Sequence, residues 1–283
     1  MQQKKTILVT GATSGIGFEA AKVIAGMGHR VLLHARTEAK GRASIEALRR
    51  EAPSADVAFV CADFSSLADV RRLADEVASE HTRLDVLLNN AGGAWFTRTL
   101  TRDGYESTFA VNHLAPFLLT RLLLERLKAS APARIVTVAS AAHRRAQLDF
   151  DDLMNTKGYK VMEAYGRSKL ANILFTRALA RRLAGTGVTA NALHPGVVRT
   201  HIGQRNFFAR IIGQVVMLAI AVPAAQGAQT SIYLATSPEV EGQSGGYYSD
   251  RRLTTPTPAA QDDAAAERLW EMSERLTGLL DVR

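Results

Sequence analysis

The chain has 283 residues, of which 47% are hydrophobic and 22% charged, proportions that are ordinary for a soluble globular protein. The formal net charge is +8, but the arginines come as scattered pairs without zinc-finger spacing or an aromatic-basic motif, which argues against nucleic-acid binding. Cys61 is the single cysteine, so no disulfide can form within one chain.

Short β-branched runs alternate with helical patterns along the chain. They predict strands at Thr6–Thr10, Arg30–His34, Val57–Ala62, Asp85–Asn89, Arg134–Ser140, Val188–Leu193 and, as a short last strand, Gly246–Tyr248. Helices are predicted at Ile16–Met27, at Glu38–Arg50, from near Ser66, and at Asp103–Lys128, Glu163–Ala184 and Ala264–Leu280. This alternation predicts an α/β fold, a doubly wound (Rossmann) parallel sheet with helices on both faces. No linker rich in proline, glycine or serine divides the chain, so we expect one domain over residues 1–283.

A glycine-rich turn follows the first predicted strand and opens the first helix. Its residues are Thr10, Gly11, Ala12, Thr13, Ser14, Gly15, Ile16 and Gly17. Glycines let a pyrophosphate approach the backbone, and the start of a helix offers free N–H groups to an anion. An ordinary glycine-rich turn is the alternative, but the position between strand and helix near the N-terminus favours a nicotinamide dinucleotide.

The end of the second strand indicates which nicotinamide cofactor is preferred. The sequence Leu33-His34-Ala35-Arg36 has an arginine where enzymes that use NAD often carry an acidic residue. Arg36 could pair with a 2′-phosphate, although a surface arginine without a ligand would give the same pattern. We expect NADP(H) as the preferred cofactor, with NAD(H) as the alternative.

Tyr165 and Lys169 lie four residues apart, and a helix places them on one face. A cation beside a phenol favours the phenolate and lowers the tyrosine pKa from its usual value of about 10. Such a tyrosine can pass protons to and from an alcohol or carbonyl oxygen. Alone, this spacing is more often a surface pair, but with a hydride carrier at the glycine turn it indicates carbonyl–alcohol redox chemistry.

Together these motifs resemble the short-chain dehydrogenase/reductase family, and within it the retinol-dehydrogenase-like branch. The resemblance covers nearly the whole chain, and beyond the glycine turn it is carried by Asn89-Asn90-Ala91-Gly92, Asn112, Ser140, Tyr165 with Lys169, and Pro195-Gly196 with Thr200. The segments most similar to the branch are Val111–Thr120, Tyr165–Asn172, His194–Thr200, Gly227–Thr230 and Arg268–Ser273. Members of this branch often prefer NADP. Many carry an N-terminal membrane anchor, which we do not expect here.

The resemblance implies a role for each matching residue. Tyr165 is similar to the catalytic acid/base, Lys169 to the residue that lowers its pKa and binds the nicotinamide ribose, and Ser140 to the hydroxyl that holds the substrate oxygen. Asn112 is similar to the residue that positions a water for proton relay. The other implied cofactor positions are Asp63 and Phe64 beside the adenine, Asn90, Ala91 and Gly92 behind the cofactor, and Pro195, Val198 and Thr200 at the nicotinamide carboxamide.

Each of these residues also has a purely structural interpretation. Ser140 could end a strand or cap a helix, Asn112 could bond its own backbone, and Asp63 could cap the helix that starts near Ser66. His194 is expected to be structural. The functional interpretation is favoured because all the structural ones would have to hold together.

The substrate site is expected at the carboxyl ends of the strands, with a lid at about residues 201–222. Apolar residues in that region either line a pocket or form core; they are Phe207, Phe208, Ile211, Ile212, Val215, Val216, Met217 and Leu218. The segment Gly93–Phe96 could add aromatic surface on the opposite side. We expect a small-molecule carbonyl or alcohol substrate that is retinoid-, steroid- or lipid-aldehyde-like.

The start of the chain and its apolar segments bear on location and partners. No signal peptide precedes the first strand, and the apolar segment Ile211–Ala225 is shorter than the roughly 20 residues of a transmembrane helix. We expect a cytoplasmic protein without a transmembrane span, while contact with a membrane surface stays open. A catalytically silent NADP-binding regulator and a membrane-surface partner protein are the alternatives, and a homo-oligomer is compatible with the resemblance.

Overall fold

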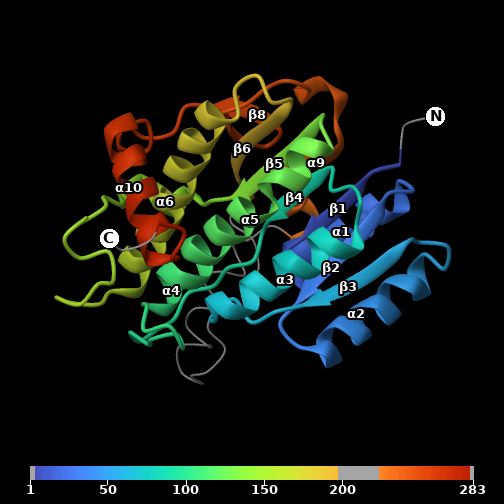
Figure 1. The fold of residues 1–283 in the computed structure, drawn as a ribbon, viewed down its shortest axis with the longest axis horizontal. Helices are drawn as coiled ribbons and strands as arrows, with labels where there is room; N and C mark the ends of the chain where they lie inside the picture. The colour runs from blue at the N-terminus through green and yellow to red at the C-terminus, as the bar shows by residue number, and fades with distance from the viewer. Residues whose placement is uncertain (1–3, 197–222, 281–283) are drawn as a thin grey trace.

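The computed structural model describes residues 4–196 and 223–280 and shows one sheet between two layers of helices (Figure 1). Within these residues eight strands pair in the order β3-β2-β1-β4-β5-β6-β7-β8. Their bounds are β1 Thr6–Val9, β2 Arg30–Ala35, β3 Val57–Cys61, β4 Val86–Asn89, β5 Ala133–Val138, β6 Val188–His194, β7 Tyr247–Ser249 and β8 Arg252–Thr254. Neighbours are parallel except β7 and β8. The strand order reverses between β1 and β4, where a doubly wound sheet opens a crevice for ligands.

Helices of different lengths connect the strands. They are α1 Gly15–Gly26, α2 Glu38–Glu51, α3 Leu67–Glu80, α4 Ser107–Phe109, α5 Ala115–Ala129, α6 Val161–Arg182, α8 Ala224–Gly227, α9 Gln229–Thr236 and α10 Asp263–Leu276. A π-helix, η1 Ala110–Leu114, joins α4 to α5, and 3-10 turns occur at η2 Ala141–Arg145, η3 Pro238–Val240 and η4 Pro258–Ala260. The predicted fold class is confirmed.

Both faces of the sheet are buried, which explains the nearly continuous apolar strands. Side chains alternate between faces along a strand, so Leu8 and Ile7 enter different cores. Leu8 joins the core under α3, α5, α6 and α10, whereas Ile7 joins the core under α1, α2 and α9. Each such burial contributes about 1.5–3 kcal/mol of transfer free energy.

Some predicted boundaries are wrong. The helix predicted from Asp103 begins only at Ser107, because Leu100 and Glu106 form an antiparallel bridge before it. The buried Glu106 carboxylate then accepts hydrogen bonds from the next two free N–H groups of the helix at 2.7 and 2.8 Å. The C-terminal helix ends at Leu276 rather than at residue 280, and β8 follows the strand that was predicted to be last.

The C-terminal helix α10 packs against α6 and reaches the π-helix η1. Trp270 of α10 stacks on Phe175 of α6, with 5.9 Å between the ring centroids. The fully buried His113 of η1 bonds Ser273 Oγ of α10 at 2.8 Å. Because His113 directly follows Asn112, α10 fixes the backbone at a predicted catalytic position.

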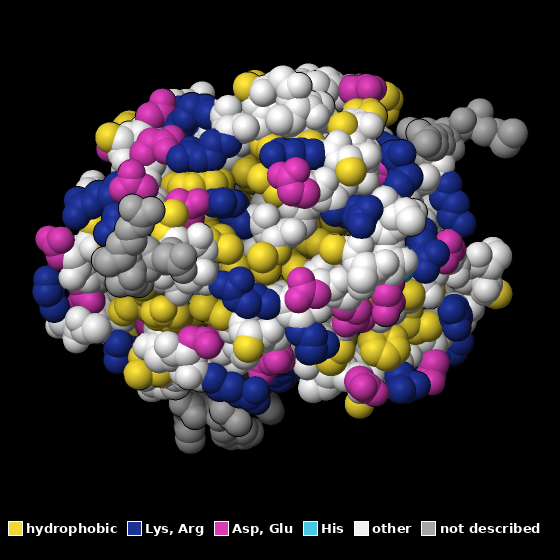
Figure 2. Space-filling view, in the orientation of Figure 1, with side chains coloured by type: hydrophobic (Ala, Val, Ile, Leu, Met, Phe, Trp, Pro, Cys, Tyr) yellow, Lys and Arg dark blue, Asp and Glu magenta, His cyan; other side chains and the backbone are white. Residues whose placement is uncertain are grey.

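The surplus of positive charge is spread over the surface. Figure 2 shows Lys and Arg side chains interspersed with Asp and Glu over the viewed face. On α6, Arg181 and Arg182 both pair with Glu267 of α10. Such exposed pairs contribute roughly 0–1 kcal/mol each, as expected for solvated helix faces. Among the helices of residues 4–196 and 223–280, none is long and apolar enough to cross a membrane.

Candidate active site

Four polar side chains predicted as catalytic come from three elements around the carboxyl ends of β4 and β5. Asn112 lies on the π-helix η1, and Ser140 follows the end of β5. Tyr165 and Lys169 lie in the second and third turns of α6. Short π-helical turns are often found at functional sites, and this one carries Asn112.

Lys169 is buried to 3% exposure, and its ammonium donates to the Val138 carbonyl of β5 at 3.1 Å. Burial lowers the pKa of Lys169 to about 8. The Nζ atom lies 5.6 Å from the centroid of the Tyr165 ring. The predicted pairing of ammonium and phenol on one helix face is therefore present.

The direction of the Tyr165 pKa differs from the prediction. Burial raises the pKa of Tyr165, and the side-chain interaction with Ser140 only partly opposes this rise. The lowering by Lys169 stays a prediction, and its ammonium bonds the Val138 carbonyl and lies 5.6 Å from the centroid of the Tyr165 ring.

Gly166 explains how Tyr165 comes so close to Ser140. A Cβ at Gly166 would lie 2.9 Å from the Ala142 carbonyl oxygen of η2, so only glycine lets α6 approach this turn. Ser140 Oγ accepts a hydrogen bond from Ala142 N at 3.2 Å and thereby caps η2. The structural interpretation of Ser140 as a cap is thus correct, and it leaves the hydroxyl next to the phenol.

The Asn112 side chain is fully buried and bonded to other segments rather than to its own backbone. Its Oδ1 accepts from Gly93 N at 2.8 Å, and its Nδ2 donates to Gly93 O and to Ser168 Oγ, both at 2.9 Å. A Cβ on Gly92 would lie 2.9 Å from Asn112 Oδ1 and 3.3 Å from Lys169 Nζ. Gly92, Asn112 and Lys169 therefore meet at one place.

The glycine turn is tied to the end of β4. Gly11 has a φ of 64°, and its Cα faces Ala91 so closely that a Cβ would lie 2.8 Å from the Ala91 Cα. Thr10 Oγ1 accepts hydrogen bonds from the backbone N–H groups of Asn90 and Ala91, both at 2.9 Å. Asn90 Nδ2 donates to Thr10 O at 2.8 Å, so the Asn90 side chain holds the turn in shape.

The residues around the start of α1 suit a dinucleotide. The Ser14 side chain makes no capping bond there, whereas α2, α3 and α10 are capped by Thr37, Ser66 and Asp262. Uncapped N–H groups at a helix start are suited to phosphate oxygens. A cavity of about 590 Å³ opens beside this turn, lined by Thr13, Ser14, Phe18, Lys40, Ala43, Ser44 and Ala47.

Two basic residues lie between the end of β2 and the first turn of α2. Arg36 is exposed directly after β2, and Lys40 of α2 lines the cavity beside Thr13 and Ser14. Neither forms an ion pair with a carboxylate within the described residues. The sequence alone does not indicate Lys40, because only the packing of α2 beside the turn brings it there.

Other predicted positions have more structural surroundings. The Asp63 carboxylate accepts from Ser65 N at 3.0 Å, and Ser66, not Asp63, caps α3. Phe64 is buried. His194 Nδ1 accepts from Ala141 N at 3.2 Å, so its ring holds the backbone that follows Ser140. Pro195 is half-buried after β6. Val198, Thr200 and the predicted lid at about 201–222 lie outside the described residues.

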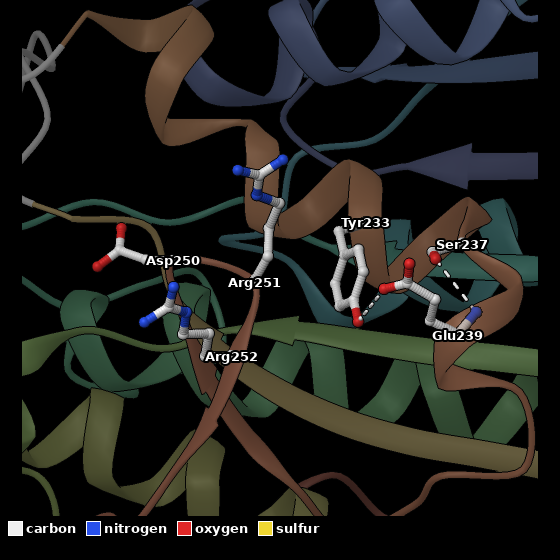
Figure 3. A pocket seen from close by; sticks show the side chains of 6 residues that line it. All are labelled: Tyr233, Ser237, Glu239, Asp250, Arg251 and Arg252. Carbon is white, nitrogen blue, oxygen red and sulfur yellow. Dashed lines mark hydrogen bonds between the residues drawn. The ribbon is translucent and has the colours of Figure 1, made fainter.

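A second depression, of about 330 Å³, lies at the hairpin between β7 and β8 (Figure 3). Figure 3 shows Arg251 and Arg252 on one side of it and the hydrogen bond from Tyr233 Oη to Glu239 Oε2 on the other. Asp250 and Arg251 form the turn with φ values of 49° and 63°. None of the predicted site residues lines this depression.

Comparison with known proteins gives concordant matches. The model of a family described as short chain dehydrogenase matches residues 5–209. Retinol dehydrogenase 14 of Mus musculus is 45% identical over 289 residues, which is 98% of this chain and 86% of that protein. A crystal structure of an uncharacterized protein from Mycobacterium paratuberculosis has a TM-score of 0.79 at 33% identity, covering 97% of this chain and 93% of that chain. The Pseudomonas aeruginosa RhlG/NADP active-site complex has a TM-score of 0.69 at 26% identity, covering 87% and 94%.

Proposed function

Because this chain belongs to the short-chain dehydrogenase family and is an NAD(P)-dependent oxidoreductase of CH–OH groups, we propose that it prefers NADP(H) and acts on an apolar carbonyl or alcohol. The main support is the convergence of Ser140, Tyr165 and Lys169 beside the glycine turn. Ser140 interacts with the Tyr165 phenol, and Lys169 lies on the same helix face.

Each side chain of the site would have its own part in the reaction. The nicotinamide of a bound cofactor would supply or accept the hydride. Ser140 Oγ would hold the substrate oxygen, and Tyr165 Oη would give it a proton in reduction and take one in oxidation. Lys169 would stabilise the tyrosinate through its charge. Both polar atoms of the Asn112 side chain already have partners, so this residue would act by holding the π-helix and the Gly92–Gly93 segment in place.

An apolar substrate is supported by apolar side chains at the start of α6 and in the loop after β4. Met162 is 66% exposed and lies three residues before Tyr165, hence on the same face of α6. Phe96, in the loop after β4, is 46% exposed, and the Trp95 ring packs against Gly93. The mouse relative is named a retinol dehydrogenase, which points to the same substrate class. The segment at about 201–222 would serve as the lid.

The proposal is tested by following NADPH consumption with retinal, a steroid ketone and an aromatic ketone, beside glyceraldehyde and pyruvate as small polar carbonyls. We expect turnover with at least one apolar substrate, with a kcat/KM at least about tenfold above the polar pair. Tight NADPH binding without turnover of any carbonyl would contradict the proposal and favour the catalytically silent regulator.

The NADP preference is supported by Arg36 and Lys40, and an Arg36→Asp variant tests it. We expect this variant to lose about 1.5–3 kcal/mol of NADPH binding free energy, the range for a hydrogen bond to a charged group, with NADH affected much less. The measurement is the KM for each cofactor. Arg50→Asp, at the far end of α2, is the matched control and should change neither. Equal Michaelis constants for Arg36→Asp and the wild type would remove the assignment.

A further inference from the structure

His34 lies near the end of β2 and holds two consecutive N–H groups of the glycine turn. Its ring atom Nδ1 accepts from Gly11 N at 3.1 Å, and its backbone oxygen accepts from Ala12 N at 3.1 Å. The residue is 4% exposed. These two amides already donate hydrogen bonds to His34. The N–H groups that follow them, at the start of α1, are therefore the ones that the turn offers to a phosphate.

The other side of the His34 ring contacts the segment after β3. Its Nε2 bonds the Ala62 carbonyl at 3.0 Å, and its ring stacks on Phe64 with 4.1 Å between centroids and 18° between planes. A carbonyl can only accept, so Nε2 carries the hydrogen and Nδ1 is free to accept from Gly11. Burial lowers the pKa of His34 to about 4, which keeps this neutral tautomer.

We infer that His34 is a positioning residue for the adenosine half of NADP(H). It joins the phosphate-binding turn to the Asp63–Phe64 segment, so that the two sites that would hold this half of the cofactor keep a fixed spacing. Arg36 follows two residues later in the sequence, directly after β2. The inference rests on the proposed cofactor binding and assigns His34 no contact with the substrate.

Two replacements separate the two hydrogen bonds of the ring. The Asn carbonyl in His34→Asn can take the place of Nδ1 and accept from Gly11, whereas the Gln amide in His34→Gln can take the place of Nε2 and donate to Ala62. His29 provides the matched control, because it is 2% exposed and its Nδ1 also accepts a backbone N–H, from Lys5 at 3.3 Å. It directly precedes β2 and therefore lies at the amino end of the strand, whereas His34 lies near the carboxyl end.

The experiment measures the Kd of NADPH and of adenosine 2′,5′-bisphosphate, the kcat with the best carbonyl substrate, and the Tm. For His34→Gln we expect both Kd values to rise about tenfold or more, with kcat within about twofold of the wild type, because the turn loses its anchor. His34→Asn should restore most of the affinity. His29→Gln should lower the Tm and leave both Kd values unchanged.

Other results would overturn the inference. Wild-type affinity in both His34 variants would show that the ring does not position the cofactor. A kcat that falls by as large a factor as the affinity would show a general distortion of the protein. If neither variant folds, hydrogen–deuterium exchange on the wild type decides: adenosine 2′,5′-bisphosphate should protect residues 10–14 and 62–64 together, and protection of one segment alone contradicts the coupling. Failure of the wild type to bind NADPH would instead sink the proposed function.

Discussion

Tyr165→Phe is expected to lower kcat by about 10²–10⁴-fold, the usual contribution of a positioned acid or base, while NADPH affinity stays close to that of the wild type. The substitution removes only the phenolic oxygen that interacts with Ser140. The ring remains, so Lys169 keeps its position over it and its bond to the Val138 carbonyl. Steady-state turnover and a fluorescence titration with NADPH measure the two quantities.

The matched control for this experiment is Tyr233→Phe on α9. Tyr233 also carries a hydrogen-bonded hydroxyl, but its partner is Glu239 beside the second depression. This variant should turn over like the wild type. A Tyr165→Phe enzyme that keeps more than about a tenth of the wild-type kcat would remove Tyr165 from the proton transfer, because such a loss lies below the range for a general acid.

Gly17→Ala is expected to disrupt the glycine turn. A Cβ at this position would overlap the Gly11 carbonyl oxygen and Asn90 Nδ2, and the carbonyl belongs to backbone that cannot rotate away. In an open helix the same change would stabilise by about 1 kcal/mol, but overpacking of this kind costs about 1–3 kcal/mol. We expect lower stability and NADPH affinity reduced at least about tenfold.

Gly26→Ala in the same helix distinguishes this clash from a general effect of alanine. Gly26 lies at the last residue of α1 with no atom within 4 Å of the added Cβ. The Tm of the Gly26→Ala variant should equal or slightly exceed that of the wild type. Its Kd for NADPH should match the wild-type value. Gly17→Ala with wild-type Kd and Tm would show that the turn tolerates a side chain and need not approach the helix so closely.

The parts of the fold that could be predicted are those with a local cause. Both faces of the central strands are buried, so runs such as Ile7-Leu8-Val9 are apolar throughout and recognisable. The glycine turn could be predicted for a similar reason, because its residues are consecutive in the sequence. The start of α4 could not be predicted, since it depends on a bridge between Leu100 and Glu106 and on burial of that carboxylate.

The chemistry was predicted less completely, because pKa values and neighbours depend on distant segments. Nothing near Asn112 signals a π-helix; its side chain is bonded to Gly93 and Ser168 of other elements. The rise in the Tyr165 pKa comes from burial by the packing of α6 on η2, whereas the spacing to Lys169 alone predicted a fall. In the sequence His34 is an ordinary strand residue. Its contacts with Gly11 and Ala62 arise only because β1 and β3 lie on either side of β2.

The docking of α10 has a consequence for synthesis of the protein. Residues 263–276 leave the ribosome after every other described element, yet they supply the Trp270 ring beside Phe175 and the hydroxyl that bonds His113. Until then, the backbone next to Asn112 lacks this partner and an aromatic surface stays open to water. Nascent chains therefore pass through a stage at which the glycine turn has been made but Trp270 does not yet cover the rings of Phe117 and Phe175.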